Sequence, residues 1–267
     1  MEEKVAVVTG AAGGIGRSVV RRLARSGVLV AAVDRYPDPL GWAVKELNEE
    51  LDAELGQRPD GAPRVVAHPA DVTSSEAVEE TVDRVEEELG PIEYLVNSAG
   101  VLRLGKVVDY SDEDWHTTFR VNVDGVFHLS RAVTRRMLPR NRGALVTVAS
   151  NAAAVPRSDM AAYAASKAAA AMFTKSLGLE VARYGIRCNI VAPGSTDTPM
   201  LRSMWPDESA SRGTLEGSPQ AFRIGIPLGR IAQPDNIADA VAFLLSDEAE
   251  QITLHVLTVD GGASLGA

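Results

Sequence analysis

Short apolar runs alternate with longer amphipathic stretches along the whole chain, and this alternation limits the possible fold more than any other feature. The apolar runs are rich in Val, Ile, Leu and Ala, with little strict polar alternation, which is typical of strands buried on both faces of a parallel sheet. The stretches between them have helical periodicity, and several end on Gly. This pattern predicts an α/β protein with a doubly wound parallel sheet. The predicted strands are KVAVVTG, GVLVAAVD, RVVAHPAD, YLVNSAG, ALVTVAS, IRCNIVAPG and LHVLTVDGG.

Domain organisation follows from the absence of repeats, low-complexity stretches and long linkers, so we predict one domain over residues 1–267. The segment 37–63 is rich in Pro, Gly and charge, and we interpret it as an elaborated connection around one helix. Residues 195–226 form a second irregular stretch that is too long and polar for a plain connector. Because long loops of this kind are often functional, we predict a substrate-loop region there.

Composition and charge narrow the function classes. The net charge of −9 and the pI near 5.0 argue against a nucleic-acid partner, since duplex binders normally present a basic face. The arginine cluster within 135–142 is predicted to be a solvated helix end. No run reaches the roughly 20 apolar residues of a membrane span, and no signal-peptide pattern is present, so we expect a cytoplasmic protein without a membrane partner. A single cysteine, Cys188, and four scattered histidines predict no disulfide framework and no metal site.

A glycine-rich segment, TGAAGGIG, follows the first predicted strand and places Gly10, Gly14 and Gly16 ahead of a predicted helix. Glycines here allow a tight turn and a close approach of the backbone to a pyrophosphate at the helix N-terminus. Such a string alone is a weak signal, but its place between a strand and a helix is what dinucleotide binding requires. We interpret it as a dinucleotide-binding loop, with a tight turn that binds no ligand as the alternative.

The choice between NAD and NADP depends chiefly on Asp34, at the end of the second predicted strand. Its carboxylate suits the ribose hydroxyls of adenosine and would repel a 2′-phosphate, which favours NAD. Arg17 and Arg35 lie nearby in the sequence and would support NADP instead. Asp71, at the end of the third strand, is a candidate adenine contact, with capping of the next helix as an equal alternative.

The segment from Ser150 to Lys167 carries the strongest chemical signal. Tyr163 and Lys167 are four residues apart in a predicted helix, so their side chains share one face. A phenol with a pKa of about 10 is a poor base at neutral pH, but a neighbouring ammonium and an oxidised nicotinamide both favour phenolate. Tyr163 would then serve in proton abstraction, with Ser150 hydrogen-bonded to the reacting oxygen.

Several motifs occur together in a fixed order: TGAAGGIG, NSAG at 97–100, Asn122, the Ser150–Tyr163–Lys167 group and PGSTDT at 193–198. On these motifs the chain resembles the short-chain dehydrogenase/reductase family over essentially its whole length. The resemblance implies a Rossmann fold with a seven-stranded parallel sheet, helices on both faces and a single domain. One departure is Ser98, where Asn is commoner in the family; we expect no loss of function from it.

The resemblance also implies roles for individual residues. Ser150 orients the substrate oxygen, Tyr163 is the acid/base, and Lys167 binds the nicotinamide ribose and lowers the pKa of the tyrosine. Asn122 holds a water in a proton relay, and Thr198 steadies the nicotinamide carboxamide. The predicted catalytic residues are Ser150, Tyr163, Lys167 and Asn122, and the predicted NAD-binding residues are Gly10, Gly14, Ile15, Gly16, Asp34, Asp71, Val72, Asn97, Ala99, Gly100, Tyr163, Lys167, Pro193, Gly194, Thr196 and Thr198.

Longer segments, among them VTVASNAAAVPRSDMAAYAASKAA and IPLGRIAQPDNIA, resemble the 2,3-dihydro-2,3-dihydroxybenzoate dehydrogenases of catechol-siderophore biosynthesis. The match is weakest within 37–63 and 205–222. It implies NAD-dependent oxidation of the ring C3 hydroxyl of a dihydro-aromatic carboxylate, followed by aromatisation. Because aromatisation makes such an oxidation effectively one-way, it fits a dehydrogenase that uses NAD.

A carboxylated substrate needs a cationic partner, and a guanidinium binds carboxylate bidentately. Arg103 and Arg157 lie on segments that border the predicted cleft, so we expect one or both to bind the carboxylate; for each, a solvated or structural arginine is the alternative. Apolar side chains at 200, 205 and 222 are expected to cover the ring as a lid. The equal alternative is that these side chains only pack against the rest of the protein. The predicted substrate-binding residues are Arg103, Ser150, Arg157, Tyr163, Met200, Trp205 and Phe222.

Three other functions remain open at this point. An enzyme acting on the amino analogue, trans-2,3-dihydro-3-hydroxyanthranilate, in antibiotic biosynthesis would need few changed contacts, since one group in a pocket shifts selectivity by about 1–3 kcal/mol. A generic alcohol dehydrogenase or ketone reductase is another candidate, and a non-catalytic NAD-sensing regulator is the third. Relatives usually form tetramers, so we expect a homotetramer, although the apolar face of AASKAAAAMFTKSLGLEVA fits core packing equally well.

Overall fold

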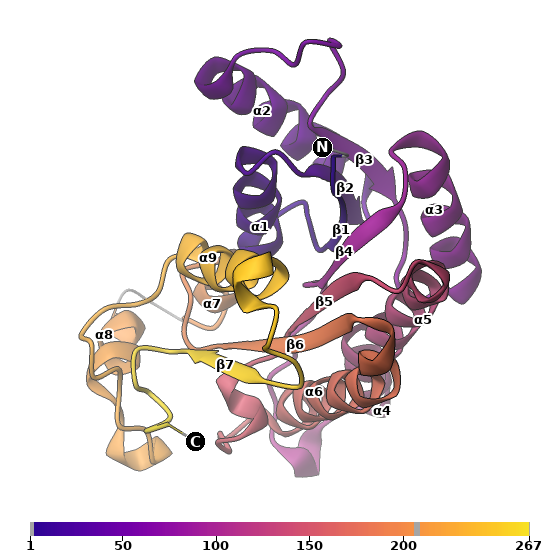
Figure 1. The fold of residues 1–267 in the computed structure, drawn as a ribbon. Helices are drawn as coiled ribbons and strands as arrows, with labels where there is room; N and C mark the ends of the chain where they lie inside the picture. Colours follow the sequence, from indigo (N-terminus) through magenta and orange to yellow (C-terminus); the bar gives the residue numbers. More distant parts are fainter. Residues whose placement is uncertain (1–2, 206–208, 267) are drawn as a thin grey trace.

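The parallel sheet predicted from the sequence is present in this computed structural model (Figure 1). The structure describes residues 3–205 and 209–266, and within them seven parallel strands follow the order β3-β2-β1-β4-β5-β6-β7. The strands are β1 Val5–Thr9, β2 Leu29–Asp34, β3 Val65–Pro69, β4 Ile92–Asn97, β5 Gly143–Val148, β6 Ile186–Pro193 and β7 Val256–Val259. All seven apolar runs are therefore confirmed as strands of one doubly wound sheet.

Both faces of the sheet are buried, which explains why its strands lack polar alternation. In β1, Ala6 and Val8 belong to the hydrophobic core on one face, and Val5 and Val7 belong to the core on the other. Because successive side chains of a strand point to opposite faces, a strand covered on both sides must be apolar at every position. Each of these four side chains is at most 1% exposed.

Helices cover the two faces in separate groups (Figure 1). The core shared with α1, α2 and α9 lies on one face, and the core shared with α3, α5 and the end of α6 lies on the other. The helices are α1 Gly14–Arg25, α2 Pro37–Leu55, α3 Ser75–Glu88, α4 Asp112–Phe119, α5 Gly125–Met137, α6 Ala161–Val181, α7 Pro199–Arg202, α8 Ser209–Glu216 and α9 Pro234–Leu245. This arrangement confirms the predicted doubly wound architecture.

Two helical segments differ from their sequence patterns. The helix within 37–63 is longer than its periodicity indicates, because Pro37 begins α2 at a position where proline is well tolerated. Residues 112–138 carry continuous helical periodicity in the sequence, but in the structure a π-helical segment, Arg120–Asp124, separates α4 from α5. At its end, a Cβ built on Gly125 would lie 2.7 Å from Val72 Cγ2, so the chain there packs too closely for a side chain.

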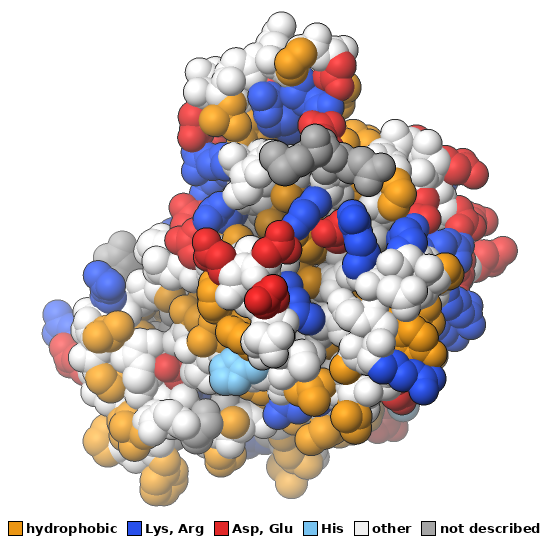
Figure 2. Space-filling model, in the orientation of Figure 1, with side chains coloured by type: hydrophobic (Ala, Val, Ile, Leu, Met, Phe, Trp, Pro, Cys, Tyr) orange, Lys and Arg blue, Asp and Glu red, His pale blue; other side chains and the backbone are white. Residues whose placement is uncertain are grey.

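Charged side chains of both signs mix over the face drawn in Figure 2. The arginine cluster expected to be a solvated helix end forms salt bridges with carboxylates of α3. Arg135 lies 3.1 Å from Glu79, Arg140 lies 2.8 Å from Glu86, and Arg136 pairs with Asp83. The cluster thus fastens α5 and its C-terminal end to α3.

None of the helices formed by the described residues is both long and apolar enough to cross a membrane. No group of three or more His, Cys, Asp or Glu side chains among these residues is arranged to hold a metal ion. Cys188 is buried in β6, and burial raises the pKa of its thiol to about 12.

Candidate active site

A cavity of about 630 Å³ opens where the carboxyl ends of β1, β2, β4, β5 and β6 meet. The strand order reverses between β1 and β4, and open α/β sheets form their ligand crevice at this switch point. The cavity brings together twelve of the predicted cofactor-binding residues: Gly10, Gly14, Ile15, Gly16, Asp34, Gly100, Tyr163, Lys167, Pro193, Gly194, Thr196 and Thr198. The other four, Asp71, Val72, Asn97 and Ala99, do not line it.

The glycine loop has a backbone that requires glycine. Gly10 and Gly14 have φ angles of 67° and 54°, in the left-handed region that side chains rarely adopt. A Cβ on Gly16 would lie 2.1 Å from the carbonyl oxygen of Gly10, so the first turn of α1 packs directly on the end of β1. The N-cap residue Gly13 caps no helical N–H with a side chain, which leaves the N-terminal N–H groups of α1 available to an anion.

Asp34 is held at the cavity wall by two backbone hydrogen bonds. Its Oδ2 accepts from the Ala12 N–H at 3.1 Å, and its Oδ1 accepts from the Arg35 N–H at 2.7 Å. Arg35, a candidate NADP ligand, turns instead to Asp71, with 3.2 Å between Nε and Oδ2. The site thus presents a fixed carboxylate to the cavity, while the nearby guanidinium is paired with another acid.

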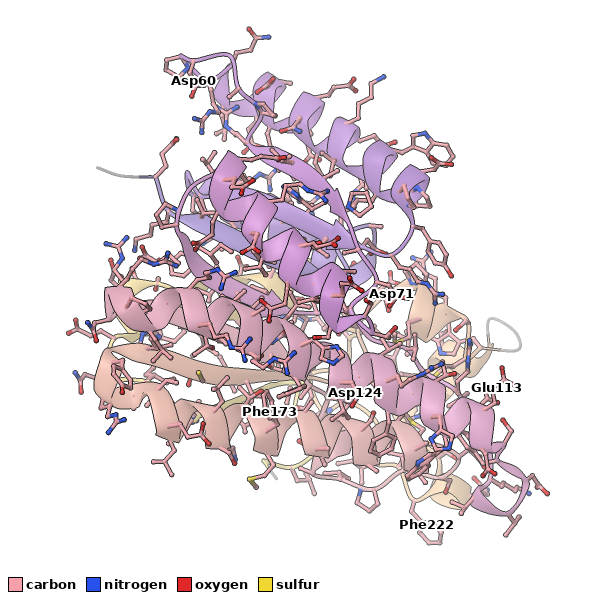
Figure 3. The ribbon with its side chains drawn as sticks, turned by 90° about the vertical axis from the view of Figure 1, so that its right-hand side faces the viewer. Asp60, Asp71, Glu113, Asp124, Phe173 and Phe222 are labelled. Carbon is pink, nitrogen blue, oxygen red and sulfur yellow. The ribbon has the colours of Figure 1, made fainter. Side chains whose placement is uncertain are left out.

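The helix cap and the loop after β3 decide one of the two alternatives for Asp71. Ser74, not Asp71, caps α3, accepting from the Ala77 N–H at 3.2 Å. Asp71 accepts from the backbone and hydroxyl of Thr73 at 2.9 and 2.8 Å, and it lies near the start of α3 (Figure 3). Capping is therefore the wrong alternative for this aspartate, and an adenine contact remains a prediction.

The loops after β1 and β4 are joined below the cavity by Thr9. Its hydroxyl accepts hydrogen bonds from the Ser98 and Ala99 N–H groups, both at 3.0 Å. Asn97 points into the interior, donating to Ser130 Oγ at 3.0 Å, and is 3% exposed. Thr9 thus holds the two loops together, whereas Asn97 ties the end of β4 to α5. Ser98 lines the cavity and takes part in the link to Thr9 through its backbone N–H.

Ser150 and Tyr163, the predicted catalytic hydroxyls, are both buried. Ser150 follows β5, and its hydroxyl accepts from the Ala152 N–H at 3.1 Å. Burial raises the pKa of Tyr163, and a hydrogen bond with the Ser150 side chain offsets part of that rise. The two hydroxyls are therefore adjacent, but the protein alone does not favour the phenolate form of Tyr163.

Lys167 lies one helical turn beyond Tyr163 on α6. Its ammonium donates to the Val148 carbonyl at 2.9 Å and lies 5.8 Å from the centre of the Tyr163 ring. Burial lowers the pKa of Lys167 to about 8, so the side chain is still mostly protonated at neutral pH. A positive charge is thereby placed beside the phenol, inside the protein.

Asn122 comes from the π-helical segment and is fully buried. Its amide donates to the Val101 carbonyl at 3.0 Å and to Ser166 Oγ at 2.9 Å, and its Oδ1 accepts from the Val101 N–H at 2.9 Å. This side chain fastens the loop after β4 to α6, which carries Tyr163 and Lys167. The irregular π-turn thus serves the site, as such turns often do.

A family model described as short chain dehydrogenase matches residues 4–209. The chain belongs to this family. It is 53% identical over 266 residues to the 2,3-dihydro-2,3-dihydroxybenzoate dehydrogenase of Bacillus subtilis (strain 168), covering 100% of this chain and 98% of the relative. It is 41% identical over 259 residues to the vibriobactin-specific 2,3-dihydro-2,3-dihydroxybenzoate dehydrogenase of Vibrio cholerae serotype O1, covering 97% and 95%.

Solved structures of similar shape carry the same architecture. The gluconate 5-dehydrogenase from Burkholderia cenocepacia J2315, in complex with NADP and tartrate, superposes with a TM-score of 0.87. It is 30% identical, and the match covers 100% of this chain and 97% of that one. The fold is thus that of a short chain dehydrogenase.

The predicted substrate side of this short chain dehydrogenase is the part of the cavity between the loop after β4, the loop before α6 and residues 195–226. Three of the residues predicted there, Arg157, Met200 and Trp205, line the cavity together with Tyr163. Further lining residues that the sequence analysis did not single out are Leu102, Leu104, Met160, Leu201, Met204, Thr214, Ser218 and Arg223. No local pattern marks these positions, because the lining depends on how the loop after β4, the loop before α6 and the described part of 195–226 come together in the fold.

Ser150, next to Tyr163, is not among the cavity-lining residues, although its neighbours Ala149 and Asn151 are. Two other predicted substrate residues lie elsewhere. The Arg103 side chain is 55% exposed and faces Asp114 on α4 at 3.5 Å, outside the cavity lining. Phe222 is 93% exposed and projects from the molecule in Figure 3. Neither is positioned to contact a molecule in the cavity as the structure stands.

Proposed function

We propose that this chain oxidises the ring C3 hydroxyl of 2,3-dihydro-2,3-dihydroxybenzoate with NAD, giving 2,3-dihydroxybenzoate. The observation that carries the proposal is the 53% identity, over the whole chain, to a relative of that name. A second relative of the same specificity, at 41% identity over 97% of the chain, supports it. The buried Ser150, Tyr163 and Lys167 beside a large cavity favour an enzyme over an NAD-sensing regulator.

The residues around the cavity suit a dinucleotide. The glycine loop has no room for a Cβ at Gly16, and the α1 N-terminus offers free N–H groups to the pyrophosphate. Asp34 would accept hydrogen bonds from the adenosine ribose hydroxyls, and its fixed charge disfavours a 2′-phosphate. Thr196 and Thr198 would border the nicotinamide, and Lys167 would bind its ribose. When bound, NAD accepts a hydride, and its positive nicotinamide favours the phenolate form of Tyr163.

Proton transfer is assigned to Tyr163. The C3 hydroxyl of the substrate gives its proton to the Tyr163 oxygen as the C3 hydride departs, so an alcohol becomes a ketone. Ser150 hydrogen-bonds the reacting oxygen, and the ammonium of Lys167 stabilises the negative charge on the phenol. The ring ketone then loses the C2 proton and enolises to the aromatic diol. The aromatic stabilisation gained makes the overall oxidation effectively one-way.

Asn122 and Lys167 are placed for the proposed proton relay behind the tyrosine. The Cβ position of Gly100 lies 3.4 Å from Asn122 Oδ1 and 3.2 Å from Lys167 Nζ, so one small space borders both groups. The Asn122 side chain itself is engaged with Val101 and Ser166. We therefore assign to Asn122 the positioning of the loop at Val101 and of α6 at Ser166, which border the relay beside Lys167.

The substrate ring is assigned to the apolar part of the cavity, under residues of the 195–226 region. Met200, Met204 and Trp205 provide one wall, and Leu102 and Leu104 provide another. These side chains exclude water from the ring, as a substrate loop should. The proposal includes this region as the substrate loop of a single domain.

A homotetramer in the cytoplasm remains part of the proposal. Two large apolar side chains on α6, Met172 and Leu179, are 62% and 73% exposed, which supports contact with another subunit. Vibriobactin appears in the name of one relative, and this supports a place in siderophore biosynthesis.

The test is to give the purified protein NAD with 2,3-dihydro-2,3-dihydroxybenzoate and, separately, with trans-2,3-dihydro-3-hydroxyanthranilate, and to follow NADH. We expect a strong preference for the dihydroxy substrate, with 2,3-dihydroxybenzoate formed in a one-to-one ratio to NADH. Tyr163→Phe should lower turnover by about 10²- to 10⁴-fold but keep NAD binding. Preference for the amino substrate, or no NADH with either one, would refute the proposed function.

A further inference from the structure

Residues 215–226 form a narrow clip at the mouth of the cavity. Ser218 and Arg223 exchange both backbone hydrogen bonds, at 2.8 and 3.0 Å, and the Ile226 N–H donates to the Leu215 carbonyl at 2.8 Å. The two paired segments pack closely, because a Cβ on Gly217 would lie 2.4 Å from the Arg223 carbonyl oxygen. The clip is therefore held by backbone bonds and close packing, which fixes the direction of the side chains on it.

Arg223 and its neighbour Phe222 point in opposite directions from this clip. Phe222 is 93% exposed and projects outward (Figure 3), whereas Arg223 is half-buried and lines the cavity. Phe222 also has a φ of 52°, an unfavourable conformation for a bulky side chain. The strained turn at residue 222 thus directs the next side chain, a guanidinium, toward the cavity.

Arg157 lines the same cavity from a different segment of the chain. It lies in the loop between β5 and α6, six residues before Tyr163, and it is also half-buried. Among the described residues, neither Arg157 nor Arg223 has a side-chain hydrogen bond or a salt bridge. Other half-buried arginines are bound: Arg140 pairs with Glu86, and Arg187 donates to three backbone carbonyls.

The two guanidiniums are close enough to influence each other. Burial lowers the pKa of both, and the charge of Arg223 lowers the pKa of Arg157 further. Asp260 acts on Arg157 in the opposite direction, but its carboxylate already accepts from Asn151 Nδ2 at 3.1 Å and from the Gly262 N–H at 2.9 Å. Two like charges that remain close and partly desolvated indicate a binding place for an anion, because an anion offsets both their repulsion and their burial.

We propose that Arg157 and Arg223 together bind the carboxylate of the substrate and so select carboxylated rings. This inference rests on the proposed function and adds to it a residue, Arg223, that lies far from the catalytic group in the sequence. Guanidiniums bind carboxylates through paired, charge-assisted hydrogen bonds, which fix orientation as well as affinity. With the carboxylate held by the two arginines, the ring presents a defined hydroxyl to Tyr163.

The experiment compares two product-like probes that differ in the carboxylate alone. Binding of 2,3-dihydroxybenzoate and of catechol is measured by calorimetry on the NAD-loaded enzyme, for wild type, Arg157→Gln, Arg223→Gln and Arg223→Lys. Each Gln variant should weaken 2,3-dihydroxybenzoate by about 10- to 100-fold, as expected for a lost charge-assisted hydrogen bond, and change catechol by less than about threefold. Arg223→Lys should fall between wild type and Arg223→Gln, because it keeps the charge but not the paired donors.

Arg103→Gln is the matched control, since the same substitution is made at an exposed arginine outside the cavity lining. It should leave both affinities unchanged. NAD affinity and the unfolding temperature, measured for every variant, should stay at wild-type values. An Arg223→Gln enzyme that still prefers 2,3-dihydroxybenzoate over catechol by the wild-type factor would overturn the proposal.

Failure of the proposed function gives a different result. If the enzyme did not oxidise the dihydroxy diene but still bound 2,3-dihydroxybenzoate through both arginines, carboxylate binding by Arg157 and Arg223 would be supported. The proposed substrate would then be wrong. If it oxidised the diene and Arg223→Gln changed neither KM nor the preference for 2,3-dihydroxybenzoate, carboxylate binding by the two arginines would be refuted. The proposed function would still be supported.

Discussion

Replacing Asp34 by Asn should change the preference between NAD and NADP more than any other single substitution. The carboxylate is fixed by the Ala12 and Arg35 N–H groups at 3.1 and 2.7 Å, so it cannot swing away from a bound 2′-phosphate. Two like charges about 4 Å apart interact by about 4 kcal/mol at an effective dielectric constant of about 20. Asp34 is partly exposed, so we halve this to about 2 kcal/mol, or roughly 30-fold in cofactor selectivity.

The assay is the ratio of kcat/KM for NAD to that for NADP with one saturating substrate. Wild type should prefer NAD, and Asp34→Asn should lower the ratio by about 30-fold or more. Part of the change comes from weaker NAD use, because the Asn amide cannot accept both backbone hydrogen bonds. Asp38→Asn is the matched control, the same substitution at an exposed position four residues on, and should leave the ratio unchanged. Equal use of both cofactors by wild type, or an unchanged ratio in Asp34→Asn, would refute this reasoning.

Three further predictions follow from the same structure. Tyr163→Phe keeps the ring but removes the proton acceptor, so kcat should fall by about 10²- to 10⁴-fold while NAD titration is unchanged; near-normal kcat would exclude Tyr163 as the base. Gly16→Ala places a Cβ 2.1 Å from the Gly10 carbonyl oxygen and should weaken NAD at least about tenfold, whereas Gly41→Ala, with open space around it, should not; equal affinities would mean that the loop adapts. Because the pKa of Cys188 rises to about 12 on folding, its contribution to stability is complete below about pH 9 and is lost between about pH 9 and 12. In chemical unfolding, the stability of wild type relative to Cys188→Ala should therefore fall by about 1.4 kcal/mol per pH unit above 9, and parallel pH curves would contradict this.

The features that local sequence determines were predictable. Each strand of a sheet covered on both faces must be apolar along its length, so Val5 to Val8 signal a strand without any knowledge of their neighbours. The tight turn at Gly10 and Gly16 likewise depends on residues within one segment. The spacing of Tyr163 and Lys167 on one helix belongs to the same class, since an interval of four residues suffices to place both on one face.

Features that depend on tertiary packing were not predictable. The break between α4 and α5 accompanies a close approach of Gly125 to Val72, which are 53 residues apart in the sequence. Arg103 was expected at the substrate, but the fold places it opposite Asp114. Arg223 reaches the cavity because of the clip to Ser218 and the turn at Phe222, and neither leaves a recognisable local pattern.

The most direct measurement follows the C3 hydrogen of the substrate. 2,3-Dihydro-2,3-dihydroxybenzoate carrying deuterium at C3 is incubated with the enzyme and NAD, and the reduced cofactor and the aromatic product are analysed by mass spectrometry. Hydride transfer from C3 predicts one deuterium in the NADH and none in the 2,3-dihydroxybenzoate. Unlabelled NADH, or product formed without reduction of NAD, would contradict oxidation at C3.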